Sequence, residues 1–285
     1  MIDTDNASET PHATPHVVMV APNGARKTKA DHPSIPIGPA ELAETALACH
    51  EVGAAAIHLH VRDANEAHSL DVDLYREALG VLRRKVGERM VVQVTTEAVG
   101  RYTPMEQMAC VDALGTELTA ISIAVRELFS EPAAEGEVEA FLRRHDTRGT
   151  GIQFICYDRG DVDWFLALRD RGMIPERFSS LLFVLGRYTR GQRSTPSDLL
   201  SFLHPQLTGI HWMVCAFGAL EGACALTSAA LGGHSRLGFE NNLLLASGDI
   251  APDNAALVAQ LVKTLPVTGR ALAGVDTARR VLGCA

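Results

Sequence analysis

The strongest constraint on the fold is a regular alternation of short apolar runs with longer amphipathic segments, beginning near residue 16. The short runs have the length and β-branched content of buried strands, and the longer segments have the period of helices. Eight strand–helix units within about 250 residues have the rhythm of a single (β/α)8 TIM barrel, an α/β fold. The predicted strands are 16–21, 56–61, 90–95, 118–124, 151–157, 180–186, 210–216 and 234–239.

The helical segments carry start and stop signals. In segment 39–53, Pro39 suits a first helical turn and Gly53 suits the end, and segment 71–87 begins acidic, ends basic and closes with Gly87. Further helices are expected to begin near residues 103, 134, 161, 197, 218 and 253.

An open doubly wound sheet is the alternative architecture. A GxGxxG fingerprint after the first strand would favour it, but the chain has APNGARKTK there. Because the chain has no internal repeat and no low-complexity linker, we expect one barrel domain over residues 16–285 and a flexible polar leader over residues 1–15.

Composition narrows the class of protein. The hydrophobic content of 47% allows a large core, and the formal net charge of −8 argues against a general nucleic-acid binder. No apolar stretch approaches the roughly 20 residues that cross a bilayer, and the N-terminal segment is acidic where a signal peptide is basic. The six scattered cysteines suit reduced core thiols. We therefore expect a cytoplasmic protein that acts on small molecules, with no nucleic-acid or membrane partner.

Two histidines stand out in the second predicted strand, AIHLHVRD. His58, His60 and Arg62 have the i, i+2 spacing that places side chains on one face of a strand. Catalytic groups of a barrel gather at the carboxyl ends of its strands, so two imidazoles converging there indicate a metal site. The alternative is that they are hydrogen-bonded core histidines.

A third metal ligand is expected from another strand. The segment GGHSRLGFENN (232–242) brings Glu240 to the end of the eighth strand, which a barrel places beside the first and close to the second. A His₂Glu set that leaves room for water or substrate is typical of a catalytic zinc site. Glu240 could instead be a carboxylate at a helix N-terminus, and the residues alone leave both interpretations open.

Other polar residues are expected at the same end of the barrel. Gln93, Thr95 and Glu97 alternate along the end of the third strand and should share a face. Two loops at this end are basic, which suggests an anionic substrate or nucleotide-like phosphates, although solvated surface charge is the usual explanation. The basic residues are Arg26, Lys27 and Lys29 in the first loop and Arg187, Arg190 and Arg193 in the second.

Taken together and in order, these segments resemble the β-keto acid cleavage enzymes. The resemblance is carried by APNGARKTKADHPSIPIGPAELAE, GAAAIHLHVRD, VVQVTT, FVLG and GGHSRLGFENN, and it runs from about residue 16 to the C-terminus. It implies a zinc-dependent (β/α)8 barrel, usually a homotetramer. It also implies a Claisen-type cleavage in which a β-keto acid and acetyl-CoA give acetoacetate and a new acyl-CoA.

The resemblance also implies roles for individual residues. The zinc ligands of the family match His58, His60 and Glu240. Its active-site serine falls on Thr95, which keeps the hydroxyl, and the arginine that pairs with its catalytic aspartate falls on Arg236.

One departure concerns proton transfer. The family's catalytic aspartate is Asn241 here, and an amide cannot take up a proton at neutral pH. Glu97 stands where relatives tend to have glycine, so we hypothesise that Glu97 replaces the aspartate as base or that the reaction differs.

A second departure concerns the substrate. Arg26 occupies the position of a family glutamate that holds a substrate ammonium, and with Asn23 and Gly24 it is a candidate substrate-binding residue. The reversed charge favours a β-keto acid with an acidic or polar tail, such as 3-oxoadipate or 3-oxoglutarate. The stretch LEGA (220–223) also replaces a Trp-His-Ile-Pro-like family segment, so the pocket shape does not simply carry over.

Two other functions remain as alternatives. A metal-dependent hydrolase of the amidohydrolase kind also uses an HxH pair, but on its first strand, with histidines on strands five and six. The other alternative is a metal-binding barrel that has lost catalysis together with the aspartate. Acetyl-CoA-dependent turnover would separate the expected acyltransferase from both.

Overall fold

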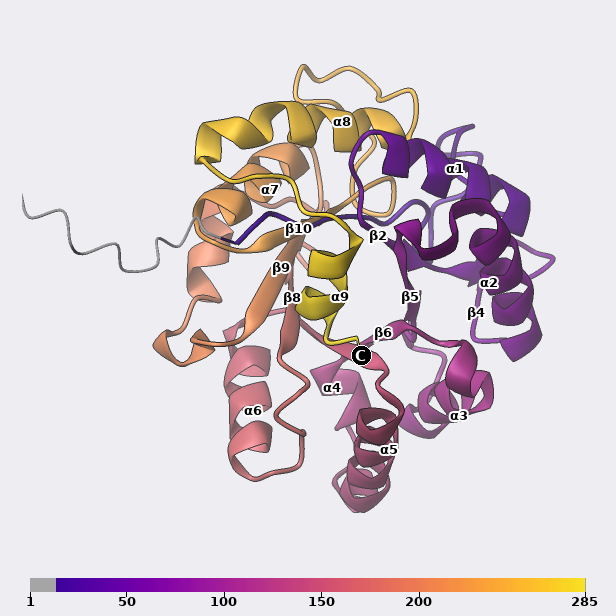
Figure 1. Ribbon diagram of the computed structural model, residues 1–285, viewed down its shortest axis with the longest axis vertical. Coiled ribbons are helices and arrows are strands. Elements are labelled where there is room, and N and C mark those ends of the chain that lie inside the picture. Colours follow the sequence, from indigo (N-terminus) through magenta and orange to yellow (C-terminus); the bar gives the residue numbers. More distant parts are fainter. Residues whose placement is uncertain (1–13, 285) are drawn as a thin grey trace, which may run out of the picture.

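The structure is a computed structural model that describes residues 14–284. Within that range, eight parallel strands close into a barrel in the order β1, β2, β5, β6, β7, β8, β9 and β10 (Figure 1). The predicted barrel is thus confirmed, and each predicted strand contains one of the eight. Their bounds are β1 Val18–Val20, β2 Ala56–Leu59, β5 Val91–Thr95, β6 Ala120–Ala124, β7 Gly151–Cys156, β8 Ser180–Leu185, β9 His211–Ala216 and β10 His234–Leu237.

Helices surround the barrel wall (Figure 1). None of the helices within residues 14–284 is both long and apolar enough to span a membrane. The α-helices of this range are α1 Pro39–Glu51, α2 Val72–Val86, α3 Pro104–Leu114, α4 Val125–Leu128, α5 Glu135–Arg148, α6 Arg159–Asp170, α7 Glu221–Ala230, α8 Asn254–Thr264 and α9 Val275–Leu282.

The start and stop signals read from the sequence lie at the helix ends. Asp71 caps α2 by accepting hydrogen bonds from two backbone N–H groups of its first turn, and Gly87 ends the helix with a φ of 57°. Thr103 and Glu106 form a capping box at the start of α3, with Pro104 in the first turn.

One predicted helix is wrong in type. The segment expected to start a helix near residue 197 forms only the 3-10 helix η4, Pro196–Ser201, followed by the 3-10 helix η5, Pro205–Leu207. Pro205 has no backbone N–H and disfavours the helical conformation of the residue before it. The segment is therefore too short for an α-helix between β8 and β9.

The second predicted strand is also shorter than expected. After β2 ends at Leu59, the short strand β3, Val61–Arg62, pairs antiparallel with β4, His68–Ser69. The Asp63 carboxylate accepts hydrogen bonds from the N–H groups of Asn65 and Ala67, which turns the chain back. Arg62 therefore lies in a hairpin beside the barrel and does not continue the barrel strand of His58.

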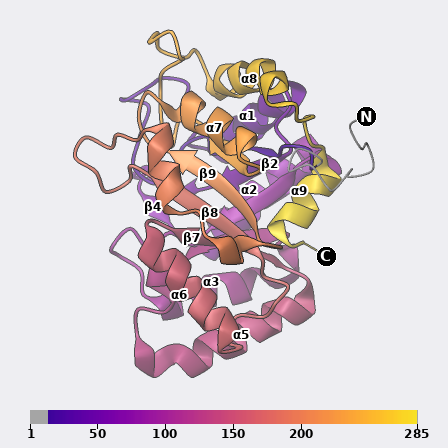
Figure 2. The same ribbon diagram turned by 90° about the vertical axis from the view of Figure 1, so that its left-hand side faces the viewer.

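Apolar side chains pack on both sides of the barrel wall. One cluster lies between the wall and the surrounding helices, and a second fills the barrel interior. The second cluster includes Val17, Val91 and Met213 together with Val281 and Leu282 of α9. Helix α9 lies across one end of the barrel (Figures 1 and 2). Helix α9 therefore covers the end of the barrel opposite the carboxyl ends of the strands.

Candidate metal centre and active site

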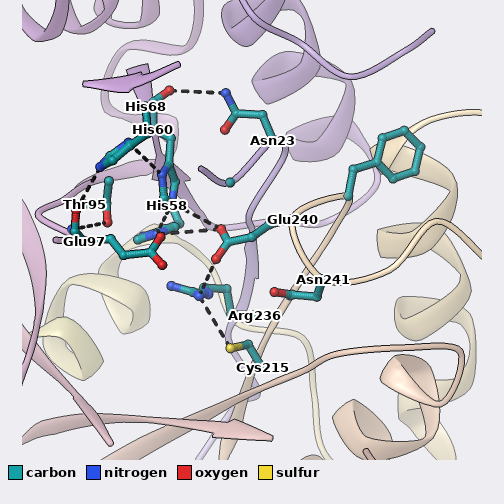
Figure 3. Close-up of polar contacts among 12 residues, drawn as sticks. Asn23, His58, His60, His68, Thr95, Glu97, Cys215, Arg236, Glu240 and Asn241 are labelled. Carbon is teal, nitrogen blue, oxygen red and sulfur yellow. Dashed lines mark hydrogen bonds and ion pairs between the residues drawn. The ribbon is translucent and has the colours of Figure 1, made fainter. Parts of the chain in front are cut away.

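Three potential metal ligands converge at the carboxyl ends of two strands. His58 lies on β2, His60 follows β2, and Glu240 follows β10; both strands pair with β1 (Figure 3). The Nε2 atoms of the two histidines are 3.1 Å apart. Glu240 Oε2 lies 3.8 Å from Nε2 of His58 and 3.5 Å from Nε2 of His60. The structure thus brings together the three residues that the sequence predicted as metal ligands.

The contacts of His58 define which of its nitrogens is free. Its Nδ1 lies 2.8 Å from Oε1 of Gln93, whose own amide nitrogen donates to Gln153. Because Gln93 offers only its carbonyl oxygen to His58, Nδ1 carries the proton and Nε2 keeps its lone pair. Burial, with Arg236 as the next contribution, lowers the pKa of His58 well below its ordinary value.

A second relay defines the free nitrogen of His60. Nε2 of His68 lies 2.9 Å from the backbone oxygen of Glu97, so this nitrogen donates and Nδ1 of His68 is left as an acceptor. Nδ1 of His60 lies 3.4 Å from that acceptor and carries the proton. Burial, followed by the neighbouring His60, lowers the pKa of His68 to about 3, so the ring of His68 is neutral. The free lone pair of His60 is therefore also on Nε2.

This arrangement fits a bound cation. Two imidazole lone pairs face each other with no proton between them, and Glu240 Oε2 is buried without a hydrogen-bond partner among residues 14–284. Ligand atoms of a tetrahedral zinc with bonds of roughly 2.0–2.2 Å are separated by about 3.3–3.5 Å, close to the spacings here. The hydrogen bonds from Nδ1 are the usual support for metal-binding histidines.

Arg236 holds the carboxylate of Glu240. Its Nη2 donates to Glu240 Oε1 at 3.0 Å and lies 3.5 Å from the sulfur of Cys215. Burial would raise the pKa of Glu240, but the opposing contributions, of which the charge of Arg236 is the largest, lower the pKa well below its usual range. Glu240 is thus a carboxylate ready to ligate a metal. Nε and Nη1 of Arg236 are buried and have no partner among the described residues.

A pocket beside the metal ligands contains the predicted catalytic residues of the third barrel strand. Thr95, at the end of β5, and Glu97 both line it, and Thr95 Oγ1 accepts a hydrogen bond from the Glu97 N–H at 3.1 Å. Nη2 of Arg187 donates to the Glu97 carboxylate at 2.8 Å. The pocket is lined by His58, Thr95, Glu97, Ile155, Tyr157, Val184, Arg187, Phe217, Arg236 and Glu240.

A second pocket continues from the first toward the exposed mouth. Glu97, Arg187, Phe217 and Glu240 line both pockets. Arg26 and Lys27, from the first basic loop, are found only in this outer pocket together with Asn23, Ala25 and Gln192. Cationic side chains outnumber carboxylates in the two linings, which suits an anionic ligand.

The first loop approaches the metal glutamate closely at Gly24. This residue has a φ of +62°, and a Cβ atom there would lie 2.5 Å from Cγ of Glu240. Lys27 Nζ donates to the backbone oxygen of Glu240 at 2.6 Å. Asn23 donates to the backbone oxygen of His60 at 3.3 Å. Two of the three predicted substrate-binding residues, Asn23 and Gly24, therefore also support the metal ligands.

Arg62 fixes the path of this loop. Its guanidinium is buried and donates to the backbone oxygens of Asn23, Gly24 and Lys27. These contacts agree with a supporting role for Arg62, next to the site and outside its chemistry.

Asn241 lies behind the pocket linings. Its Nδ2 donates to Oε1 of Glu221 at 3.1 Å, and its Oδ1 has no partner among the described residues. Burial raises the pKa of Glu221 to about 8 in spite of hydrogen bonds from Gly238 and Asn241. The residue at the position of the family aspartate is thus an amide held by another buried carboxylate.

Two residues of the site escaped the sequence interpretation. His68 supports His60, and Glu221 supports Asn241, but neither belongs to a recognisable motif. Glu221 is the first residue of α7, where acidic residues are common for helix-dipole reasons alone, so its sequence position carried no functional signal.

A family model described as beta-keto acid cleavage enzyme matches residues 15–284. The chain is 29% identical to a 3-keto-5-aminohexanoate cleavage enzyme of Fusobacterium nucleatum subsp. nucleatum, with 93% of this chain and 97% of the relative covered. It is 27% identical to a 3-oxoadipate:acetyl-CoA acetyltransferase of Cupriavidus necator, with 94% and 95% covered.

Solved structures share the barrel. The binary complex of ObcA with oxaloacetate superposes with a TM-score of 0.65 at 15% identity, covering 89% of this chain and 68% of that chain. A type I 3-dehydroquinate dehydratase from Clostridium difficile superposes with a TM-score of 0.60 at 8% identity, covering 90% and 95%. At these identities the likeness describes the fold alone.

Proposed function

This chain belongs to the beta-keto acid cleavage enzyme family, and from that premise we propose that it catalyses the zinc-dependent cleavage of a β-keto acid with acetyl-CoA. The products are acetoacetate and a new acyl-CoA. The substrate has an acidic or polar tail in place of the amine of 3-keto-5-aminohexanoate.

The observation that carries the proposal is the pair of buried histidines whose Nε2 atoms converge beside an ionised glutamate. His58, His60 and Glu240 would hold the metal, and the ion would act as a Lewis acid on the keto acid carbonyl. Arg236 keeps Glu240 ionised and has further N–H groups for an anionic substrate. Glu97, within the same pocket, is the proposed base.

The tail specificity rests on charge at the mouth. Arg26 lines the outer pocket together with Lys27 and Arg187, so a carboxylate tail meets cations there. An ammonium tail would be repelled by the same groups. The name of the Cupriavidus necator relative, a 3-oxoadipate:acetyl-CoA acetyltransferase, supports a dicarboxylic substrate.

The proposed function is tested with a panel of β-keto acids in the presence and absence of acetyl-CoA. We expect acetyl-CoA-dependent turnover, with 3-oxoadipate or 3-oxoglutarate preferred over 3-keto-5-aminohexanoate. Hydrolysis without acetyl-CoA would support the amidohydrolase alternative, and tight binding without turnover would support a barrel that only binds its ligand.

The tail proposal predicts the effect of reversing the charge of Arg26. Arg26→Glu is expected to raise the KM for 3-oxoadipate roughly tenfold to a hundredfold and to narrow or invert the preference over the amino-keto acid, because it replaces an attractive charge by a repulsive one. Arg84→Glu, at an exposed position on α2, is the control with the same change in net charge. Equal effects of both variants would refute a local role of Arg26.

The metal proposal predicts stoichiometric zinc in the purified protein and its loss in His60→Ala. The substitution removes one of the three proposed ligands and leaves only His58 and Glu240. Elemental analysis measures the metal directly, and His50→Ala at the end of α1 is the matched control. Full zinc content in His60→Ala would contradict the assigned ligand set.

The resemblance to the family further supports a cytoplasmic homotetramer as part of the proposal. Light scattering coupled to size-exclusion chromatography gives the oligomeric state in solution. A monomeric active enzyme would exclude the tetramer and leave the proposed chemistry standing.

A further inference from the structure

A buried carboxylate behind the active site is not used by the proposed chemistry. Glu221 is 2% exposed and lines neither of the two pockets at the metal site. Its Oε1 accepts hydrogen bonds from the backbone N–H of Gly238 at 3.0 Å and from Nδ2 of Asn241 at 3.1 Å. Nδ2 of Asn242 lies 3.5 Å from Oε2. All three partners belong to the segment that carries Glu240.

These contacts determine which end of the Asn241 amide faces the carboxylate. The backbone N–H of Gly238 and Nδ2 of Asn241 both donate to Oε1 of Glu221, so Oε1 acts as the acceptor oxygen and a proton on this carboxyl group belongs on Oε2. In this arrangement the group of Asn241 that faces Oε1 is its NH₂. The amide oxygen is left on the opposite side.

That oxygen lies on the side of the metal site. In Figure 3 the oxygen end of Asn241 points toward Arg236 and Glu240. Oδ1 of Asn241 is buried and has no hydrogen-bond partner among residues 14–284, and the same holds for Nε and Nη1 of Arg236. Such atoms are costly to bury unless a substrate or water completes them.

We propose that Glu221 is a positioning residue that orients the Asn241 amide so that its carbonyl oxygen, and not its NH₂ group, faces the active site. The position keeps a hydrogen-bond acceptor but has no ionisable group, and the carboxyl group that contacts it, Glu221, lies behind it and lines neither pocket of the site. The role in turnover rests on the proposed function; the contact itself does not.

The inference predicts opposite effects of one substitution in two backgrounds. Met has nearly the shape of Glu but a much weaker acceptor, so Glu221→Met frees the amide to flip in the wild-type background. We expect kcat for the preferred keto acid to fall about tenfold to a hundredfold, with zinc content and KM little changed. Glu221→Gln keeps an acceptor oxygen toward Gly238 and Asn241 and is expected to retain kcat within about threefold.

In the Asn241→Asp background the same substitution should help. The introduced aspartate and Glu221 would then be two carboxyl groups at about the present donor–acceptor spacing, which cannot both ionise without strong repulsion. Replacing Glu221 by Met removes the second carboxyl group and its proton, so the introduced aspartate no longer shares a proton with it. The double variant is therefore expected to have a higher kcat than Asn241→Asp alone.

The two readouts separate the inference from the proposed function. If the wild-type enzyme turns over no β-keto acid, the proposed function fails, but the four Tm values of the cycle still test the contact. If Glu221→Met lowers kcat in both backgrounds, Glu221 has only a structural role and the inference is overturned. It would also be overturned if Glu221→Gln lost as much kcat as Glu221→Met, because charge would then matter more than the acceptor.

Discussion

The hydrogen bonds behind the two histidines determine what those histidines can do. A proton on Nδ1 of both rings leaves two lone pairs 3.1 Å apart, which is unfavourable unless a cation lies between them. Gln93 and His68 are therefore as much part of the candidate metal site as the proposed ligands themselves. Loss of either would cost metal affinity without removing a ligand.

Glu97 is the residue on which proton transfer is proposed to depend. Its carboxylate lines the pocket and forms an ion pair with Arg187. Glu97→Gln is expected to lower kcat about 10²- to 10⁴-fold, because general-base catalysis contributes that range, with zinc content unchanged. Steady-state kinetics on the preferred β-keto acid measures the effect.

A control is needed because Gln also loses the ion pair with Arg187. Arg187→Gln breaks that pair and keeps the carboxylate, so its effect should fall mainly on KM. Glu44→Gln, at a surface ion pair with Lys85, should change nothing. Turnover of Glu97→Gln within about threefold of wild type would remove Glu97 as the base.

At the scale of single residues, residue type and spacing in the sequence predicted which side chains gather at the site. His58, His60 and Glu240 were predictable because strand periodicity and barrel closure place them together. The partner of Asn241 was not, because Glu221 is 20 residues away and its approach depends on how α7 begins after β9. Hydrogen-bond partners of this kind depend on loop paths, which no periodicity encodes.

At the scale of single elements, the loop after β1 links the outer pocket to the proposed metal ligands. Arg62 leaves the barrel wall in the β3–β4 hairpin and donates to backbone oxygens of this loop. A pattern of alternating residues predicted one continuous strand and could not show the break after Leu59. The break results from the turn at Asp63, whose side chain replaces strand pairing by local hydrogen bonds.

The close approach of this loop to Glu240 predicts the effect of adding one methyl group. Gly24→Ala is strained because its φ is +62°, and the new Cβ would collide with Cγ of Glu240. We expect zinc affinity to fall at least tenfold and stability to fall by roughly 1–3 kcal/mol. Competition with a chelator and chemical denaturation measure the two effects.

Gly136→Ala provides the matched control. Gly136 lies within α5, and a Cβ there meets no atom within 4 Å. Since alanine is the better helix former, this variant should be about 0.5–1 kcal/mol more stable and bind zinc as the wild type does. Unchanged zinc affinity in Gly24→Ala would mean that the loop can move without disturbing the metal ligand.

At the scale of the whole molecule, barrel closure is what assembles the site. β1 pairs with β2 on one side and with β10 on the other, so residues 58 and 240 become neighbours although 182 positions separate them. The order of the eight strands followed from the alternation of apolar and amphipathic segments. The type of helix after β8 could not be predicted from this alternation, because a short proline-containing segment can satisfy the same pattern with 3-10 turns.

The opposite end of the barrel contains buried histidines that predict acid sensitivity. His16 is fully buried there, with Nδ1 bonded to the backbone oxygen of Gly233. Burial, followed by the charge of Arg270, lowers the pKa of His16 from 6.5 to about 3, and burial followed by His16 lowers that of His234 well below its ordinary value. Both rings are therefore neutral in the folded protein at neutral pH.

The direction of the pH effect follows from proton binding. Between pH 6.5 and about 3 the unfolded chain protonates His16 and the folded chain does not, so the stabilising contribution present above pH 6.5 is lost as the pH falls through this window. For one such group the slope of unfolding free energy against pH is about 1.4 kcal/mol per pH unit.

His16→Asn keeps a donor near Nδ1 but cannot titrate, so it should reduce that slope by up to this amount. Urea denaturation from pH 7.5 to 4.5 measures it, with His50→Asn on α1 as the control. If the curves of unfolding free energy against pH are parallel for wild type and His16→Asn, the acid sensitivity arises elsewhere. Metal release does not affect this comparison, because the two proteins have the same proposed metal ligands.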